Sequence, residues 1–361
     1  MSLGGSGETS DCSRSDTMHA VEPRQPPATV LRLFKRSVAE DAPVTSRSTA
    51  LFRFGEQCNN HCPMCSNTGD AALFFHSTEE LLRRAAFLHG RGFRRVVVTG
   101  GEATIHPGFW TVVERLAAYG MVWDVNTHGR TFSKPDVAQR AVATGLKRAI
   151  VSLHSLHAPT SAALFGASEE AHHETVAGIE RLLSAGVDVM LNCVLTRLNL
   201  PLLDDDLQAG YRRFGSRVSF KFVFPSTIGK GGQWPAIATL RYRDVREPVR
   251  RLRARAAELG LRIFFESFPH CIHQDPNAVN LGRSAFGETH YLDDATGDRI
   301  YAMRHIEAEL SAFGEACRNC GAARRCGGVS LQYAKRYGVD ELAPFPPRPA
   351  RPTAGSRNRP R

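Results

Sequence analysis

The chain has 361 residues, of which 42% are hydrophobic and 23% charged, the composition of an ordinary folded protein. No apolar run approaches the roughly 20 residues that cross a bilayer, and the N-terminal residues are too polar for a secretory signal. We therefore predict a cytoplasmic protein without a membrane partner. The formal net charge of +10 suggests nucleic-acid binding, but much of that charge lies in a Pro-rich C-terminal end, which argues against such a role.

Short β-rich runs alternate with amphipathic stretches from Ala50 onward, the pattern of βα units around a parallel sheet. The predicted strands are 51–54, 95–99, 121–126, 148–153, 187–195 and 218–223. The predicted helices between them are 77–89, 108–119, 135–144, 170–185 and 203–214. A basic helix at 242–259 and a short strand at 261–265 follow.

Six such units with right-handed crossovers predict an α/β fold, a partial (β/α)6 TIM-like barrel. A doubly wound open sheet gives a similar pattern, so periodicity alone does not separate the two. The predicted domains are a largely disordered arm at 1–47, the barrel at 48–235, a small loop-rich cysteine-bearing segment at 236–344 and a basic, Pro-rich disordered tail at 345–361.

Three cysteines, Cys58, Cys62 and Cys65, directly follow the first predicted strand. The chain has nine cysteines, and in a reducing compartment such tight spacings favour metal ligation over disulfides. Three thiolates on one short loop can ligate three irons of a cubane cluster and leave the fourth iron open. The alternative is a zinc knuckle in which His61 or a more distant residue supplies the fourth ligand.

The Cys-x3-Cys-x2-Cys loop after a first strand resembles that of the radical S-adenosylmethionine (SAM) superfamily. This resemblance implies a 4Fe–4S cluster whose open iron binds the amino and carboxylate groups of SAM. It also implies that an electron from the cluster cleaves SAM to a 5′-deoxyadenosyl radical, which abstracts hydrogen from a substrate. The usual electron donor in the family is of the flavodoxin or ferredoxin type.

Strand-end motifs support this resemblance. Thr99-Gly100-Gly101-Glu102 ends the second strand and resembles the family's GGE motif, in which the glycines allow close backbone approach and Glu102 accepts from the SAM ammonium. Asn126-Thr127-His128-Gly129 ends the third strand and resembles the Thr-Asn-Gly signature, but its changed order leaves open which side chain points inward. The resemblance places six other residues near SAM: Met64, Asn126, Thr127, Ser152, Asn192 and Arg197.

A second cysteine group, Cys317-x2-Cys320-x5-Cys326, lies near the C-terminus, with Cys271 upstream. Four cysteines are the complement that fills a cluster or a tetrahedral zinc site. The spacing resembles the twitch and SPASM appendages of radical SAM enzymes. It implies a C-terminal iron–sulfur domain with a second, auxiliary 4Fe–4S cluster, and zinc remains the alternative.

The predicted function is that of a radical SAM oxidoreductase or maturase. Its substrate is predicted to be a peptide or a natural-product intermediate, which undergoes net oxidation, cross-linking or epimerisation. No leader-recognition module is predicted before the barrel, so a peptide and a small molecule both stay open. Two alternatives from other classes are a radical enzyme that modifies RNA, whose affinity would fall steeply with salt, and a non-enzymatic zinc-binding scaffold.

Overall fold

One nine-stranded sheet organises the protein. Its structure is a computed structural model that describes residues 43–66, 74–227, 229–275, 288–294 and 296–347. The strand order is β7-β6-β5-β4-β3-β2-β1-β8-β9. Neighbours in the sheet are parallel except for β8 and β9, which pair antiparallel. Cys12, the predicted disorder at 1–42 and most of the predicted tail lie outside the described residues.

The strands of this sheet are β1 (Ser48–Arg53), β2 (Arg95–Thr99), β3 (Val122–Thr127), β4 (Leu146–Ser152), β5 (Asp188–Val194), β6 (Val218–Val223), β7 (Ile263–Glu266), β8 (Glu288–Leu292) and β9 (Ile300–Ala302). A separate small sheet pairs β10 (Ser311–Ala312) with β11 (Val329–Ser330). Each of the seven predicted strands is present, and two of them, β2 and β6, have the predicted ends.

The α-helices are α1 (Thr78–Gly90), α2 (Phe109–Ala118), α3 (Val137–Ala143), α4 (Ala158–Phe165), α5 (Glu169–Ser184), α6 (Leu203–Phe214), α7 (Pro235–Ala238), α8 (Tyr242–Glu258), α9 (Met303–Glu309) and α10 (Leu331–Tyr337). Short 3-10 helices are η1 (Ala103–Ile105), η2 (Arg130–Ser133), η3 (Leu200–Leu202), η4 (Gly215–Arg217), η5 (Gly229–Gly232) and η6 (Glu315–Asn319). Helix α1 begins as its sequence predicts, because the side chain of Ser77 accepts a hydrogen bond from the backbone amide of Glu80. None of the helices in the described ranges is long and apolar enough to cross a membrane.

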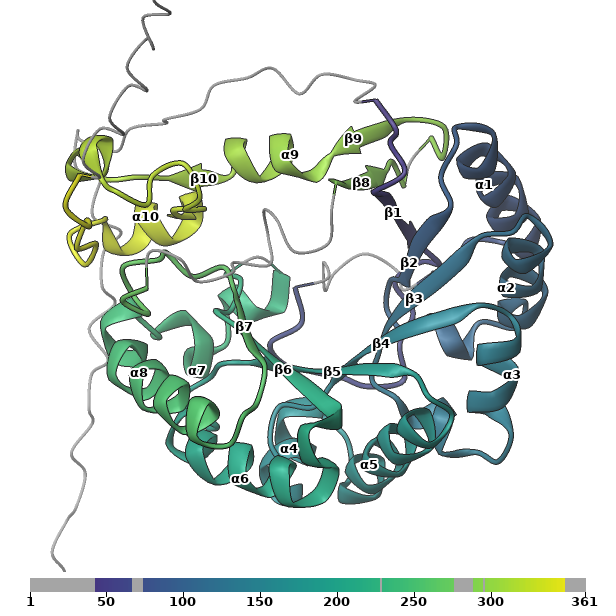
Figure 1. Ribbon diagram of the computed structural model, residues 1–361, viewed down its shortest axis with the longest axis horizontal. Helices are drawn as coiled ribbons and strands as arrows, with labels where there is room; N and C mark the ends of the chain where they lie inside the picture. Colours follow the sequence, from purple (N-terminus) through teal and green to yellow (C-terminus); the bar gives the residue numbers. More distant parts are fainter. Residues whose placement is uncertain (1–42, 67–73, 228, 276–287, 295, 348–361) are drawn as a thin grey trace, which may run out of the picture.

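The strand order from β1 to β7 follows the chain without reversal, whereas a doubly wound sheet changes direction at a switch point. Figure 1 shows the strands curving around a common centre, with α1, α2, α3, α5, α6 and α8 on the outside. Within the described ranges β7 and β9 are edge strands, so the barrel is open. This confirms the predicted α/β partial barrel.

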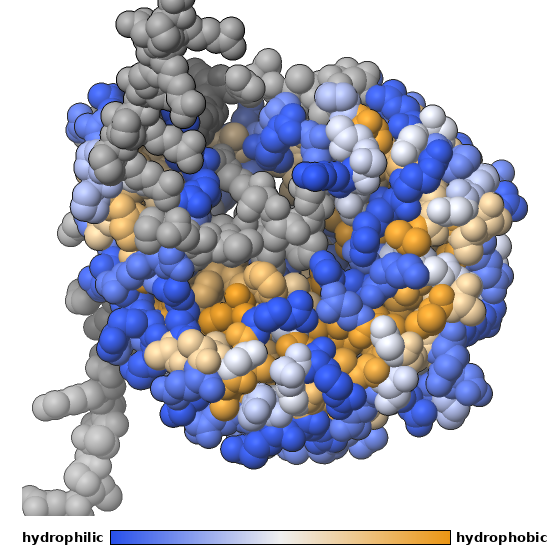
Figure 2. Space-filling model, viewed as in Figure 1, coloured by the Kyte–Doolittle hydropathy of each residue, from blue (hydrophilic) through white to orange (hydrophobic). Residues whose placement is uncertain are grey.

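The main core lies between the sheet and the outer helices. Alternate residues of the strands, such as Phe52, Val98 and Val125, are fully buried there. Trp123 is buried among them and donates its indole N–H to the backbone oxygen of Thr144, 2.8 Å away. Figure 2, in the same view, shows hydrophobic residues in an arc inside a hydrophilic rim. The other residues of each strand face the inside of the barrel, where the polar strand ends meet.

The C-terminal third of the chain contributes strands to this sheet. Strands β8 and β9 lie beyond residue 236, yet β8 pairs with β1 in parallel, with Ala50 opposite His290. The turn after β8 is also tied to the barrel, because Arg53 lies 2.7 Å from Asp294 and the buried Arg84 donates to the backbone oxygen of Asp294. The predicted cysteine-bearing segment therefore contributes strands to the same sheet as well as its loops.

Candidate functional site

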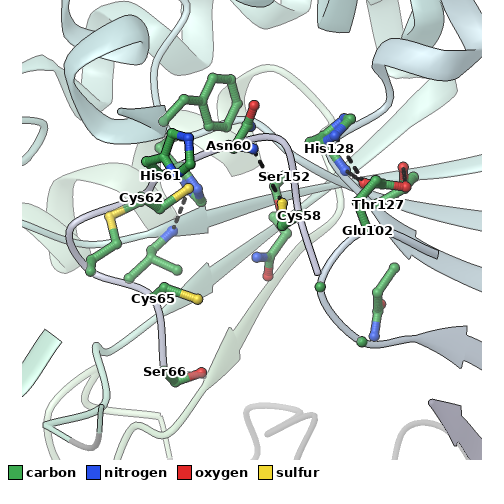
Figure 3. Close-up of a pocket in the computed structure, with 18 of the residues that line it drawn as sticks. Cys58, Asn60, His61, Cys62, Cys65, Ser66, Glu102, Thr127, His128 and Ser152 are labelled. Atoms are coloured by element: carbon green, nitrogen blue, oxygen red, sulfur yellow. Dashed lines mark hydrogen bonds and ion pairs between the residues drawn. The ribbon is translucent and has the colours of Figure 1, made fainter. Parts of the chain in front are cut away.

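A cavity at the carboxyl ends of the parallel strands gathers most of the predicted site. Cys58, Cys62 and Cys65 line it together with polar residues from the ends of β2 to β5 (Figure 3). The predicted residues that line it besides these cysteines are Met64, Gly100, Gly101, Glu102, Asn126, Thr127, Ser152 and Asn192. The carboxyl ends of barrel strands are where active sites form in this architecture.

The three cysteines are partly buried and carry free thiols. Burial raises the pKa of Cys58 to about 11 and that of Cys62 to about 12, and the neighbouring cysteines add to both shifts. A thiolate in this loop therefore needs positive charge nearby, which a metal centre supplies. The amide of Asn60 already donates to the Cys58 sulfur over 3.4 Å.

The two glycines of the Gly100-Gly101-Glu102 motif hold the cysteine loop against β2. The amide of Gly101 donates to the oxygen of Gly55 and that of Glu102 to the oxygen of Gln57, both at 2.9 Å. A Cβ on Gly101 would lie 2.2 Å from the Gln57 oxygen, and Gly100 has a φ of +135°. Here the glycines allow close approach of protein backbone, a reason that differs from the predicted approach to a ligand.

Glu102 is 1% exposed and is held by four donors around the cavity. Its Oε1 accepts from the Thr104 amide at 3.2 Å, the Thr104 hydroxyl at 2.6 Å and the Thr127 hydroxyl at 2.8 Å. Its Oε2 accepts from the His128 amide at 2.8 Å. Each carboxylate oxygen has about two acceptor positions, and Oε2 accepts this one hydrogen bond with the His128 Nε2 3.4 Å away, so Oε2 retains capacity for one more donor.

The order Asn126-Thr127-His128 left open which side chain points inward, and all three line the cavity. The Asn126 amide donates to the Thr99 hydroxyl, and the Thr127 hydroxyl binds Glu102. His128 is buried and burial lowers its pKa; its Nδ1 accepts from the Arg130 amide, which assigns the proton to Nε2.

Ser152 and Asn192 occupy adjacent strands at the same height, because they are paired in the register of β4 and β5. The Oδ1 atom of Asn192 is buried without a hydrogen-bond partner among the described residues, and so is the Nδ2 atom of Asn60. Both residues line the cavity. Buried polar atoms are rarely left unpaired in proteins, so this pair indicates that the cavity is shaped for a polar ligand.

The structure does not bring Arg197 into the cavity. Its guanidinium donates to the Thr239 oxygen at 2.7 Å and to Asp244 at 2.9 Å, and its side chain is about half exposed. Lys230, which the sequence analysis did not select, lines the cavity instead. It lies on η5, the Gly-Lys-Gly-Gly turn after β6, where the Gly231 amide donates to the Cys65 oxygen at 3.4 Å.

Other cavity residues were also missed, among them His154 and Phe165. His154 follows β4 and is 4% exposed; burial lowers its pKa to about 3, and its Nδ1 accepts from the Val194 amide. Phe165, at the end of α4, packs against that ring. The sequence signal for both residues was weak. His154 lies two residues beyond Ser152, the strand-end residue that was selected, and Phe165 ends a short helix that the sequence analysis did not predict.

The second cysteine group also gathers around one small cavity. Cys317, Cys320 and Cys326, which lie close together in the sequence, line it with Cys271 from a separate upstream segment. Backbone amides already donate to two sulfurs: Phe345 to Cys320 at 3.3 Å and Gly328 to Cys326 at 3.4 Å. The remaining described cysteine, Cys193, lies in the main core and lines neither cavity. Within the described ranges no group of His, Cys, Asp and Glu is arranged to hold a single metal ion.

Fold and cavity together define an α/β partial-barrel enzyme with a three-cysteine loop at the mouth of the barrel. Residues 52–209 match the radical SAM superfamily, and this part of the chain is a radical SAM domain. The family implies a 4Fe–4S cluster and SAM. The three thiols on one cavity wall and the two unpaired polar atoms fit these groups.

Among curated proteins, the GTP 3′,8-cyclase of Heliobacterium modesticaldum is 27% identical over 215 residues, which cover 58% of this chain and 62% of that protein. The mycofactocin maturase MftC of Mycobacterium ulcerans is 32% identical over 135 residues, 37% of this chain and 36% of that protein. The chain thus matches less than two thirds of the length of either relative.

Two solved structures share the fold across most of the chain. Streptococcus suis SuiB bound to S-adenosylmethionine aligns with a TM-score of 0.56 at 11% identity, covering 81% of this chain and 76% of that one. Histidine-tagged anSMEcpe with bound AdoMet aligns with a TM-score of 0.56 at 13% identity, covering 82% of this chain and 88% of that one. At these identities the likeness concerns the fold alone.

Proposed function

We propose that this radical SAM enzyme cleaves SAM reductively and uses the resulting radical to abstract hydrogen from a peptide or natural-product substrate. Net oxidation, cross-linking or epimerisation would follow, as in an oxidoreductase or maturase. The observation that carries the proposal is the shared cavity of Cys58, Cys62 and Cys65 with the strand-end residues. When bound, the cluster supplies the electron for cleavage, and a flavodoxin or ferredoxin-type protein would supply it in turn.

The protein's own groups would bind and orient SAM. Glu102 offers its Oε2 to the ammonium, and Lys230 offers a positive charge to the carboxylate. Ser152 and the unpaired Oδ1 of Asn192 would bind the ribose hydroxyls. Met64 is buried beside Cys65 and can pack against the adenine through its polarizable side chain.

We propose that Cys271, Cys317, Cys320 and Cys326 hold the auxiliary 4Fe–4S cluster, within the C-terminal segment at 236–344, whose strands β7, β8 and β9 extend the sheet of the barrel. Their common cavity supports a four-ligand site. With every iron ligated by protein, such a centre suits electron transfer from a substrate radical rather than SAM binding. Zinc would fill the same four positions, and iron analysis separates the two.

The substrate class can be decided by a direct comparison. The curated relatives include a GTP cyclase and a mycofactocin maturase, so a nucleotide and a peptide are the two substrates to test. The reconstituted protein should form 5′-deoxyadenosine from SAM under dithionite. Mass spectrometry should then show a candidate precursor peptide losing two hydrogens on oxidation or cross-linking, or gaining one deuterium from D2O on epimerisation, with GTP unchanged. The opposite result would assign a small-molecule reaction, and absence of 5′-deoxyadenosine would refute the proposed function.

A further inference from the structure

The loop that follows β3 reaches across to the cysteine loop. The Nε2–H of His128 donates to the side-chain oxygen of Asn59 at 2.7 Å. The Nη1 of Arg130 donates to the side-chain oxygen of Asn60 at 3.0 Å and lies 3.4 Å from the backbone oxygen of Asn59. Asn59 and Asn60 lie between Cys58 and Cys62. The contacts from His128 and Arg130 therefore hold the segment that carries the proposed cluster ligands.

The loop after β3 is also held by contacts with helix α5. The Arg130 Nε lies 2.6 Å from the Oε2 of Glu174, on α5. The next residue of that helix, Thr175, donates its hydroxyl to the backbone oxygen of His128 at 2.8 Å. The His128 amide is bound by Glu102. Both backbone groups of His128 are therefore hydrogen-bonded to the barrel, and its side chain is 5% exposed, so the barrel sets the position from which the ring reaches Asn59.

The positions of Asn59 and Asn60 affect the hydrogen bond that the Cys58 sulfur accepts. The backbone amide of Asn60 donates to that sulfur at 3.4 Å, and the next amide, that of His61, donates to the Phe165 oxygen at 3.0 Å. Because Arg130 holds the side-chain oxygen of Asn60, the other end of that amide, Nδ2, remains unpaired in the cavity wall. Hydrogen bonds to cluster sulfurs are among the features that set reduction potentials.

We propose that His128 and Arg130, braced by Glu174, are positioning residues that hold Asn59 and Asn60 so that the Asn60 amide donates to the Cys58 sulfur, which makes the SAM-binding cluster easier to reduce. We name this set of residues the loop clasp. The proposal rests on the proposed function, since it assigns the cluster to this loop. The clasp acts on the cysteine loop through the asparagines; His128 also lines the cavity, with its Nε2 3.4 Å from the Oε2 of Glu102.

The test compares clasp variants by EPR-monitored redox titration of the reconstituted protein. Arg130→Met and His128→Leu should shift the midpoint potential to more negative values, whereas the conservative His128→Gln should recover part of the loss by donating to Asn59. The matched control is Arg213→Met, which removes an exposed arginine in the last turn of α6 that is paired with Glu180 at 2.9 Å and does not line the cavity. The control should leave the potential unchanged.

Glu174→Leu separates positioning from simple electrostatics. Loss of this carboxylate removes a negative charge, so a through-space effect alone would make the potential more positive. If Glu174 instead acts by holding Arg130 in place, its loss frees Arg130 and should make the midpoint potential more negative. A positive shift in Glu174→Leu, or no shift in Arg130→Met, would overturn the proposal.

A second readout needs no cluster. In the apo protein, hydrogen exchange of a peptide covering residues 56–66 should accelerate in Arg130→Met and His128→Leu but not in Arg213→Met. Unchanged exchange in both clasp variants would overturn the proposal. If the unmodified protein fails to assemble any iron at Cys58, Cys62 and Cys65, the proposed function fails, while the exchange experiment still decides whether the clasp holds the loop.

Discussion

The two cysteine groups of this protein differ in what surrounds them. The first has three cysteines at the ends of parallel strands, in a cavity with a buried carboxylate, a lysine and two unpaired amide atoms. The second has four cysteines in a small cavity lined mainly by apolar residues such as Phe313, Ala322 and Leu342. A three-cysteine site with polar neighbours is suited to a small molecule, whereas a four-cysteine site with apolar neighbours is suited to structure or electron transfer.

The largest expected effect comes from removing the cysteines of the first group. Replacing Cys58, Cys62 and Cys65 together with Ala should reduce 5′-deoxyadenosine formation under dithionite below detection, because the SAM-binding cluster loses all its protein ligands. Iron at the second group should remain and is measured by metal analysis. Cys193→Ala, which changes a buried cysteine outside both cavities, is the control and should retain SAM cleavage and iron at both groups. Persistent SAM cleavage in the triple variant would contradict the assignment.

The next largest effect concerns the second group. Replacing Cys317 and Cys320 with Ala should stop or misroute product formation, because a substrate radical would lose its electron acceptor. Reductive cleavage of SAM should stay measurable, since the first group is intact. Quantifying 5′-deoxyadenosine and product in the same reaction distinguishes the two steps. Unchanged product would assign this group a purely structural role.

A third prediction uses His154, which lies in the first cavity. Its folded pKa is lowered to about 3 by burial, against about 6.5 in an unfolded chain. The unfolded state therefore takes up a proton below pH 6.5 that the folded state does not, so stability falls as the pH falls. The cost is about 2 kcal/mol between pH 7 and 5. Urea titrations of the apo protein should show a smaller loss over this interval in His154→Gln, and equal losses would refute the assignment.

The smallest expected effect concerns SAM affinity. Lys230→Met should weaken SAM binding about tenfold, because a charge-assisted bond to the carboxylate contributes about 1.5 kcal/mol or more. Arg197→Met is the matched control, since that guanidinium is bound to Thr239 and Asp244 outside the cavity. Calorimetry with the reconstituted protein measures both. A loss confined to Arg197→Met would reverse the roles of the two residues.

Local pattern predicted the barrel because it is built from local units. The apolar runs at β2 and β6 are short, β-branched or aromatic, and their ends are sharp. The Ser77-Thr78-Glu79-Glu80 sequence is typical of a helix start, and the predicted helix at 77–89 begins there as α1. Motifs at strand ends could be placed together since parallel strands end at one edge of the sheet.

What sequence could not predict depends on contacts between distant residues. The pairing of β8 with β1 joins segments more than 200 residues apart, and no local signal specifies such a partner. Arg197 follows β5, and its direction is set by Asp244, on α8. Lys230 lies in a Gly-rich turn outside the strand-end motifs, and the packing of that turn against the cysteine loop brings it to the cavity.

The central claim is that SAM binds at the three-cysteine loop, and one measurement tests it most directly. The protein is reconstituted with iron and sulfide under anaerobic conditions, reduced with dithionite and examined by EPR with and without SAM. We predict a reduced 4Fe–4S signal that changes when SAM is added and that disappears from the Cys58, Cys62 and Cys65 triple variant. A cluster signal that SAM leaves unchanged would contradict the claim.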